Sequence, residues 1–337
     1  MSDALLSPAV GLTAAAAAAA MVAHSARRAS AEPQHARRIP LMGVMAAFVF
    51  AAQMINFSIP GTGSSGHIAG GLLLAVLLGP YAAFIAIASV ITIQCLLFAD
   101  GGLLALGCNI LNMGFWPCFI GLPLCRAITG ATPTPRRAAL AAVAASVVSL
   151  QIGALCVVIE TVLSGRSELS FGYFGAVMLA IHLPIGIAEG HITAGVLRVL
   201  SSVVTARDET GAARKTSRPL LAGIAMAALL TGGFLAWFAS QKPDGLEWSV
   251  ARVTGAAELS APRDGVHAGA FAVQRKTAVM PDYQLPISAP HLGASLAGIS
   301  GVIGAGVVVG AMGFAMVFAR SENRKLQMAN HKSEPPS

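Results

Sequence analysis

Ionisable side chains interrupt long apolar stretches of this 337-residue sequence, namely Glu160, His182, Glu189 and His191. Glu160, His182 and Glu189 each lie in a run long enough to cross a hydrocarbon layer of about 30 Å. An ionisable group at such a position is costly and therefore indicates function. His182 and Glu189 are seven residues apart, which places them on one face of a helix. Two interpretations stay open: contact with a substrate, or hydrogen bonds that hold helices together.

A glycine- and serine-rich loop, PGTGSSGH (residues 60–67), ends in a histidine, His67. Glycine permits tight turns, and serine hydroxyls and backbone groups offer oxygen and nitrogen atoms to a ligand. A histidine at the start of a helix is also typical of a cap or of a surface residue. The residues predicted to support a site are Gly61, Gly63, Ser64, Ser65 and Gly66, together with Asn109 and Asn112 from a second polar cluster.

The composition places these groups in a membrane protein. Hydrophobic residues make up 55% and charged residues 11% of the chain, whereas soluble domains carry about 25% charged residues. Continuous apolar runs predict an all-α polytopic bundle and exclude a β-barrel. Nine transmembrane helices are predicted, at residues 8–24, 40–57, 67–79, 80–98, 102–125, 138–163, 172–200, 219–240 and 294–319. The third run has only 13 residues, so it is either a short tilted helix or a re-entrant segment.

Basic residues predict the orientation of the bundle. With the N-terminus outside and the C-terminus in the cytoplasm, 16 of the 22 Lys and Arg residues fall on the cytoplasmic side. The net charge is +7, and the basic residues that produce it lie between the apolar runs and are not interleaved with aromatic residues. We therefore expect a lipid membrane and no nucleic acid as partner.

The chain divides into two predicted membrane modules. Residues 1–205 hold about seven helices, residues 206–218 form a charged cytoplasmic linker, and residues 219–337 hold two helices. The second module carries an outer loop, 241–293, and a polar tail that we expect to be disordered.

Small residues recur every four positions in the second predicted span. They are Gly43, Ala47 and Ala51, and they allow another helix to approach closely. The approaching helix can belong to this chain or to a partner.

Three segments in chain order carry a resemblance to a known family: NFSIPGTGSSGHIAGGLLLAVLLGPYAAF, FADGGLLALGCNILNMGF and HLPIGIAEG. They are similar to the cobalt and nickel specificity subunits of energy-coupling factor transporters, the CbiM/NikM family, as is the N-terminal SDALLSPAV. KPDGLEWSV (242–250) and PDYQLP (281–286) resemble the accessory module named for its PDGLE motif. The resemblance implies the substrate-capture component of an ATP-driven Co²⁺ or Ni²⁺ importer in a bacterial inner membrane.

The resemblance also implies partners. These are a transmembrane coupling subunit, docked on the small-residue stripe, and cytoplasmic ATPase subunits. The sequence contains no G-x-x-x-x-G-K-[ST] phosphate loop, so we expect no ATP site in the chain itself. The resemblance to a transporter subunit implies that the chain is not an enzyme. The alternative is a self-sufficient cation channel or proton-coupled metal carrier that uses Glu160, His182 and Glu189 as a relay.

The resemblance further implies nitrogen ligands for the metal. In the family these are the N-terminal amine, the backbone nitrogen and imidazole of a histidine at position two, and the histidine that corresponds to His67. Nitrogen ligands in a square plane suit Ni²⁺ or Co²⁺, and the fused PDGLE-type module slightly favours nickel. This sequence begins Met1, Ser2, Asp3, so the histidine at position two is missing. Either translation begins two residues upstream, or the histidine is lost, and then the affinity for the metal is weak or another group, such as Asp3 or a residue near Asn109, replaces it.

Overall fold

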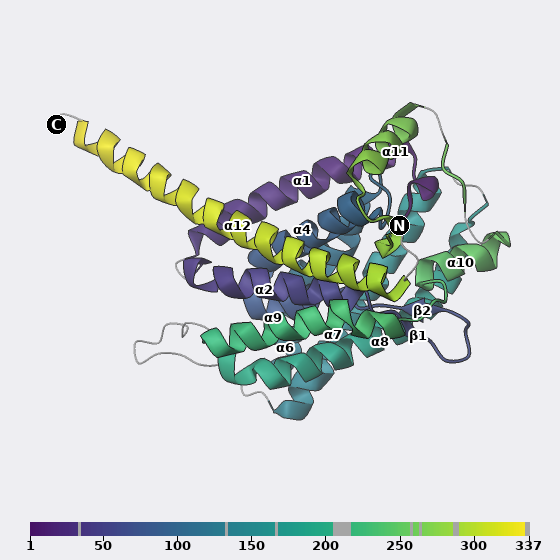
Figure 1. Cartoon of the computed structure of the whole chain (residues 1–337), viewed down its shortest axis with the longest axis horizontal. Helices are drawn as coiled ribbons and strands as arrows, with labels where there is room; N and C mark the ends of the chain where they lie inside the picture. Colours follow the sequence, from purple (N-terminus) through teal and green to yellow (C-terminus); the bar gives the residue numbers. More distant parts are fainter. Residues whose placement is uncertain are drawn as a thin grey trace.

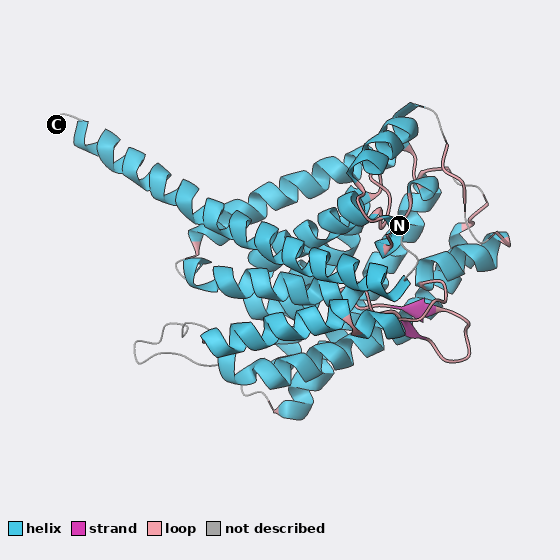
Figure 2. Cartoon of the chain, in the orientation of Figure 1, coloured by secondary structure: helices cyan, strands magenta, loops and turns pink. Residues whose placement is uncertain are grey.

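The computed structural model describes residues 1–32, 35–131, 134–165, 168–204, 217–256, 259–262, 265–285 and 290–333. Helices lie side by side in an elongated bundle, and the last one, α12, projects beyond it (Figure 1). A short antiparallel hairpin, β1 (Phe57–Ser58) and β2 (Ser65–Gly66), stands at one end (Figure 2). We call this the loop end, because Met1 lies there as well.

Six helical stretches among the described residues are long and apolar enough to cross a membrane. They are α1 (Pro8–Ala31), α4 (Pro80–Phe98), the run α5 (Leu106–Ile110), η2 (Leu111–Phe115), η3 (Pro117–Gly121) and α6 (Leu122–Thr129), then α7 (Pro135–Leu163), α8 (Phe171–Val204) and α12 (Pro290–Ser333). Three further helices match the other three predicted spans: α2 (His35–Gln53), which is as long as α4, and the shorter α3 (Gly71–Leu78) and α9 (Arg218–Gly233). The fold is therefore helical, as predicted, while nine membrane crossings stay a prediction.

The outer surface of the bundle is apolar. Leu140, Val199 and Phe314 are 67%, 77% and 66% exposed. Extensive exposed apolar surface is unusual for a soluble monomer and is typical of helices that face lipid. Side chains of α3 and α4 are by contrast almost all buried, so these two helices form the centre of the core.

The short third span runs antiparallel to α2. At the loop end, Gln53 Nε2 donates a hydrogen bond to the Ala69 carbonyl at 2.8 Å. At the other end, Arg38 Nη1 donates to the Leu78 carbonyl at 3.2 Å. An eight-residue helix is about 12 Å long, so the extended residues before α3 cover part of the distance. These contacts favour a short helix that reaches the opposite end of α2 over a re-entrant turn.

The small-residue stripe of α2 packs inside the chain. A Cβ atom at Gly43 would lie 2.9 Å from the Gly306 carbonyl oxygen of α12, and Ala47 and Ala51 are 6% and 0% exposed. The close helix approach is thus made by α12 of the second module. Docking of a coupling subunit on the same stripe stays a prediction. It would require α12 to move away from α2.

The polar C-terminal segment differs from its prediction. Helix α12 continues to Ser333, so residues 320–333 are helical where we expected a disordered tail. The segment lacks glycine and proline and is rich in residues with high helix propensity, which lets the preceding helix propagate into it. Residues 334–337 and most of the predicted linker, 206–216, lie outside the described residues.

Two glycines bring α8 into contact with α7. A Cβ atom at Gly186 would lie 3.0 Å from Val147 Cα, and one at Gly190 would lie 2.4 Å from Val143 Cα. The two glycines are four residues apart and face the same neighbour, so α8 is fixed against the α7 backbone.

We expect Gly190→Ala to destabilise the protein by about 1–3 kcal/mol, because the added methyl group would force two helix backbones apart. Thermal unfolding of the purified chain in detergent measures the effect. Gly195→Ala is the matched control, because nothing lies within 4 Å of a Cβ at that position of the same helix. Equal melting temperatures for the two variants would contradict this account of the packing.

Candidate functional site

The His67 loop is a tight hairpin turn. Gly61 and Gly63 have φ angles of +77° and +80°, which favour glycine, and the Ile59 amide donates to the Ser64 carbonyl at 2.9 Å. The loop ends in His67, which is half-buried and whose Nδ1 lies 3.1 Å from the Ile68 carbonyl oxygen. With Nδ1 protonated for that contact, Nε2 carries the lone pair that can bind a metal.

The second module clamps this loop from outside. The Ser65 amide donates to the Pro243 carbonyl at 2.8 Å, and Ser65 Oγ donates to the Lys242 carbonyl at 2.7 Å. Trp248 Nε1 donates to the Thr62 carbonyl at 3.0 Å. The PDGLE segment (residues 242–248) therefore supplies backbone acceptors and one aromatic donor to the loop.

The helix that follows the clamp has a strong N-terminal cap. In α10 (Gly245–Thr254), Asp244 Oδ1 accepts from the Glu247 amide at 2.8 Å, and Glu247 Oε2 accepts from the Asp244 amide at 3.1 Å. This reciprocal pair is a capping box. The acidic residues of the motif thus fix the start of α10, while its backbone holds the loop.

His182 and Glu189 of α8 lie on the inner side of the loop, consistent with their predicted common face. Glu189 accepts hydrogen bonds from the amides of Ala69 and Gly70 at 3.1 and 3.0 Å. His182 Nδ1 donates to the Met178 carbonyl at 2.7 Å, and a Cβ at Gly245 would lie 3.1 Å from His182 Cε1. His182 is therefore packed against the PDGLE segment.

The predicted asparagines hold other polar groups. The Met1 carbonyl accepts from the Gly102 amide at 3.0 Å and from Asn109 Nδ2 at 3.3 Å. Asn112 Nδ2 donates to Glu160 Oε2 at 2.8 Å. Asn109 thus binds the amino-terminal segment, and Asn112 binds the half-buried carboxylate of Glu160.

Asp3 lies in the same amino-terminal segment. Its Oδ1 accepts from the Ala105 amide at 3.0 Å. Burial raises the pKa of Asp3, and that hydrogen bond partly offsets the effect. Asp3 is therefore engaged by the start of the α5 run.

The outer loop covers the amino-terminal segment through residues that the sequence analysis did not single out. His267, on α11 (Gly265–Thr277), donates from Nε2 to the Leu6 carbonyl at 3.0 Å, and Gln274 Nε2 donates to the Gly101 carbonyl at 2.7 Å. The Tyr283 hydroxyl, in η5 (Pro281–Tyr283), donates to Asp100 Oδ2 at 2.6 Å. Burial and the Asp100 carboxylate raise the pKa of Tyr283 well above its usual value. Only the PDYQLP resemblance pointed to this segment.

His67 and Met1 lie at the same end of the bundle but contact different partners. Among the described residues, no group of three or more His, Cys, Asp or Glu side chains could hold a metal ion. A metal bound by His67 therefore needs ligands beyond such a side-chain cluster, and amine or backbone nitrogens are the donors that the resemblance implies.

The apolar helices and the exposed apolar surface define a multi-pass membrane protein. The family described as "Cobalt uptake substrate-specific transmembrane region" (CbiM) matches residues 1–206, and the PDGLE domain matches residues 218–320. The chain therefore belongs to the CbiM family of cobalt and nickel transport proteins, with a PDGLE domain fused to its C-terminal side.

The chain is also similar to individual transport proteins. The chain is 37% identical over 286 residues to the "Putative fused nickel transport protein NikMN" of Archaeoglobus fulgidus, covering 83% of this chain and 87% of that protein. It is 30% identical to the cobalt transport protein CbiM of Geobacter sulfurreducens, covering 67% of this chain and 68% of the relative. A crystal structure titled as a truncated transition metal transporter superposes with a TM-score of 0.52 at 30% identity, covering 60% of this chain and 98% of that one.

We expect Asp244→Ala to loosen the clamp on the His67 loop, because loss of an N-terminal cap costs about 1 kcal/mol. Hydrogen–deuterium exchange of the Ser65 amide, which is bonded to Pro243, should become about fivefold faster. Asp244→Asn is the matched control, because its amide oxygen can still accept from Glu247. Unchanged exchange in Asp244→Ala would show that the clamp does not depend on the capping box.

Proposed function

We propose that this chain is the substrate-capture component of an energy-coupled importer for nickel or cobalt ions. The proposal rests above all on the placement of His67. It stands at the end of a hairpin that α8 holds from inside and the PDGLE segment holds from outside. A ligand held in this way is preorganised to bind an ion before any partner acts.

The distribution of basic residues supports a loop end that faces outward. Arginine side chains contact the chain at the opposite end. Arg38 Nη1 lies 3.5 Å from Glu32 Oε2. The Arg137 side chain donates to the Ile128 carbonyl, and the Arg320 side chain donates to the Ser30 carbonyl. Clusters of arginine next to apolar helices favour the cytoplasmic side. The N-terminus and His67 are then outside and the C-terminal end of α12 is in the cytoplasm.

Energy for transport is proposed to come from partners. The sequence has no phosphate-binding loop, so ATP hydrolysis falls to separate ATPase subunits joined through a transmembrane coupling subunit. This chain would capture and present the ion without acting as an enzyme.

Nitrogen donors are the proposed ligands. His67 offers one imidazole, and the Met1 amine lies at the same end of the bundle. Such donors suit both Ni²⁺ and Co²⁺. The PDGLE domain of this chain, and its 37% identity to a relative named as a putative fused nickel transport protein, favour nickel.

We expect His67→Ala to abolish retention of Ni²⁺ and Co²⁺ by the purified chain while leaving it folded, because the substitution removes a ligand from a loop. Metal analysis after gel filtration measures this. His191→Ala is the control, because His191 is exposed and its Nδ1 lies 2.8 Å from the Ile187 carbonyl of its own helix. Full metal content in His67→Ala would remove His67 from the site.

We expect the chain alone, reconstituted in liposomes, to move Ni²⁺ far more slowly than the chain with its coupling and ATPase partners. Uptake of Ni²⁺ with and without ATP measures the difference. Full-rate uptake by the chain alone would instead support a self-sufficient channel or carrier. The described contacts give little support to that alternative, because Glu160, His182 and Glu189 bond to three different partners.

A further inference from the structure

We propose that Glu189 is the positioning residue for His67: its carboxylate fixes the backbone immediately after the histidine without touching the metal. This inference rests on the proposed function, because it assumes that His67 is the ligand. Glu189 lies in α8, more than a hundred residues after His67 in the sequence.

The carboxylate binds two consecutive amides, one with each oxygen. Ala69 N donates to Oε2 at 3.1 Å and Gly70 N donates to Oε1 at 3.0 Å. Glu189 is only 3% exposed, so these charge-assisted bonds form away from water, where they are strong and costly to lose. The two amides follow His67 by two and three residues, which leaves the imidazole little freedom relative to the carboxylate.

The same two residues are held from the opposite side. Gln53 Nε2 donates to the Ala69 carbonyl at 2.8 Å. Gly70 has a φ of +76°, and a Cβ at this position would lie 2.6 Å from Val49 Cγ1. Helix α2 therefore contacts the same two residues that Glu189 binds, so this backbone is held by two helices.

Glu189 itself stands on a rigid support. Its neighbour Gly190, and Gly186 one turn earlier, bring the α8 backbone into contact with Val143 and Val147 of α7. Because α8 is packed firmly against α7, the Glu189 carboxylate has a fixed position and holds the loop backbone that it binds. A carboxylate that served only to join helices would be expected to bond a side chain of another helix, whereas both observed partners of Glu189 are backbone amides just before α3.

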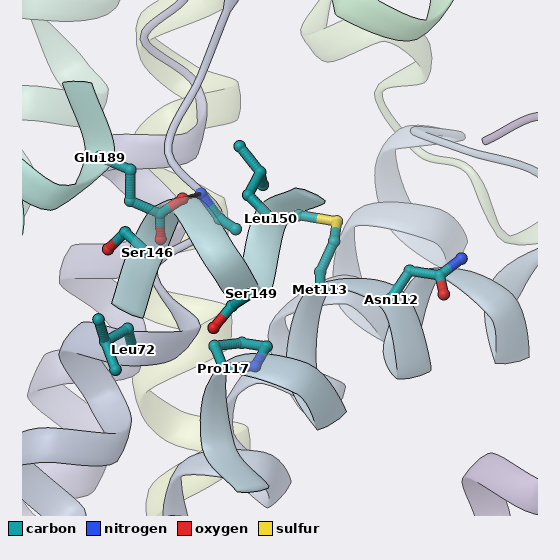
Figure 3. Close-up of a pocket in the computed structure, with 9 residues that line it drawn as sticks. Leu72, Asn112, Met113, Pro117, Ser146, Ser149, Leu150 and Glu189 are labelled. Atoms are coloured by element: carbon teal, nitrogen blue, oxygen red, sulfur yellow. Dashed lines mark hydrogen bonds between the residues drawn. The ribbon is translucent and has the colours of Figure 1, made fainter. Parts of the chain in front are cut away.

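A small, mostly apolar cavity lies beside the carboxylate. Its volume is about 10 Å³, and Figure 3 shows Glu189 and Ser146 side by side at its wall, with Asn112, Ser149 and Leu72 also lining it. Ser146 Oγ is buried and has no hydrogen-bond partner. Ser146 shares the cavity with Glu189 but does not bond the loop, so it offers a matched control.

The test is the affinity of the full-length chain, purified in detergent, for Ni²⁺. In Glu189→Gln one loop amide would face an NH₂ group instead of an oxygen, so we expect the dissociation constant to rise about 10–100-fold. The visible absorption spectrum of the nickel-saturated variant should match that of the unsubstituted chain, because the ligands are the same. Ser146→Ala should change neither the affinity nor the spectrum.

Unchanged affinity in Glu189→Gln would overturn the proposal, and an altered spectrum at saturation would overturn it by making Glu189 a ligand. If Glu189→Gln does not fold, Glu189→Asp, which keeps the charge but is one methylene shorter, replaces it with the same two readouts. Failure of both variants to fold would assign Glu189 to the stability of the fold instead. The proposed function fails independently of Glu189 in either of two cases. In the first, the unsubstituted chain binds no Ni²⁺; in the second, the His67→Ala variant binds Ni²⁺ as tightly as the unsubstituted chain.

Discussion

Irregular backbone inside an apolar bundle must find hydrogen-bond partners within the protein, because lipid offers none. The segment between α2 and α3 meets this constraint with partners from three parts of the chain. Glu189 accepts from two of its amides, Gln53 donates to one of its carbonyls, and the PDGLE segment accepts from Ser65. His67 is held in place because the backbone around it is satisfied in this way.

This constraint also explains why the two modules form one structure. The PDGLE segment supplies bonds that the hairpin lacks, and α12 fills the small-residue groove of α2 at Gly43. The second module thus contacts the first both at the loop end and along the bundle. In the proposed importer, the same module would therefore influence ion capture directly, through the loop that carries His67.

Much of the architecture could be predicted from the sequence. The apolar runs gave helices close to their observed positions, since a continuous run of about 20 apolar residues has few other stable arrangements in a membrane. The turn at Gly61 and Gly63 was predictable because glycine alone adopts such angles freely. The helical end of α12 differs from the expected disordered tail, because this segment is polar but lacks helix breakers.

The sequence by itself determined the helical membrane class and the order of the two modules, because these depend on local composition and short motifs, and the resemblance to a known family singled out His67 as the candidate ligand. Only the tertiary structure decided that Glu189 binds the loop, that Asn109 holds Met1 and that Gly43 faces α12. Each of these contacts joins residues far apart in the chain. Their pairing depends on how the helices pack, and an isolated sequence pattern does not specify that packing.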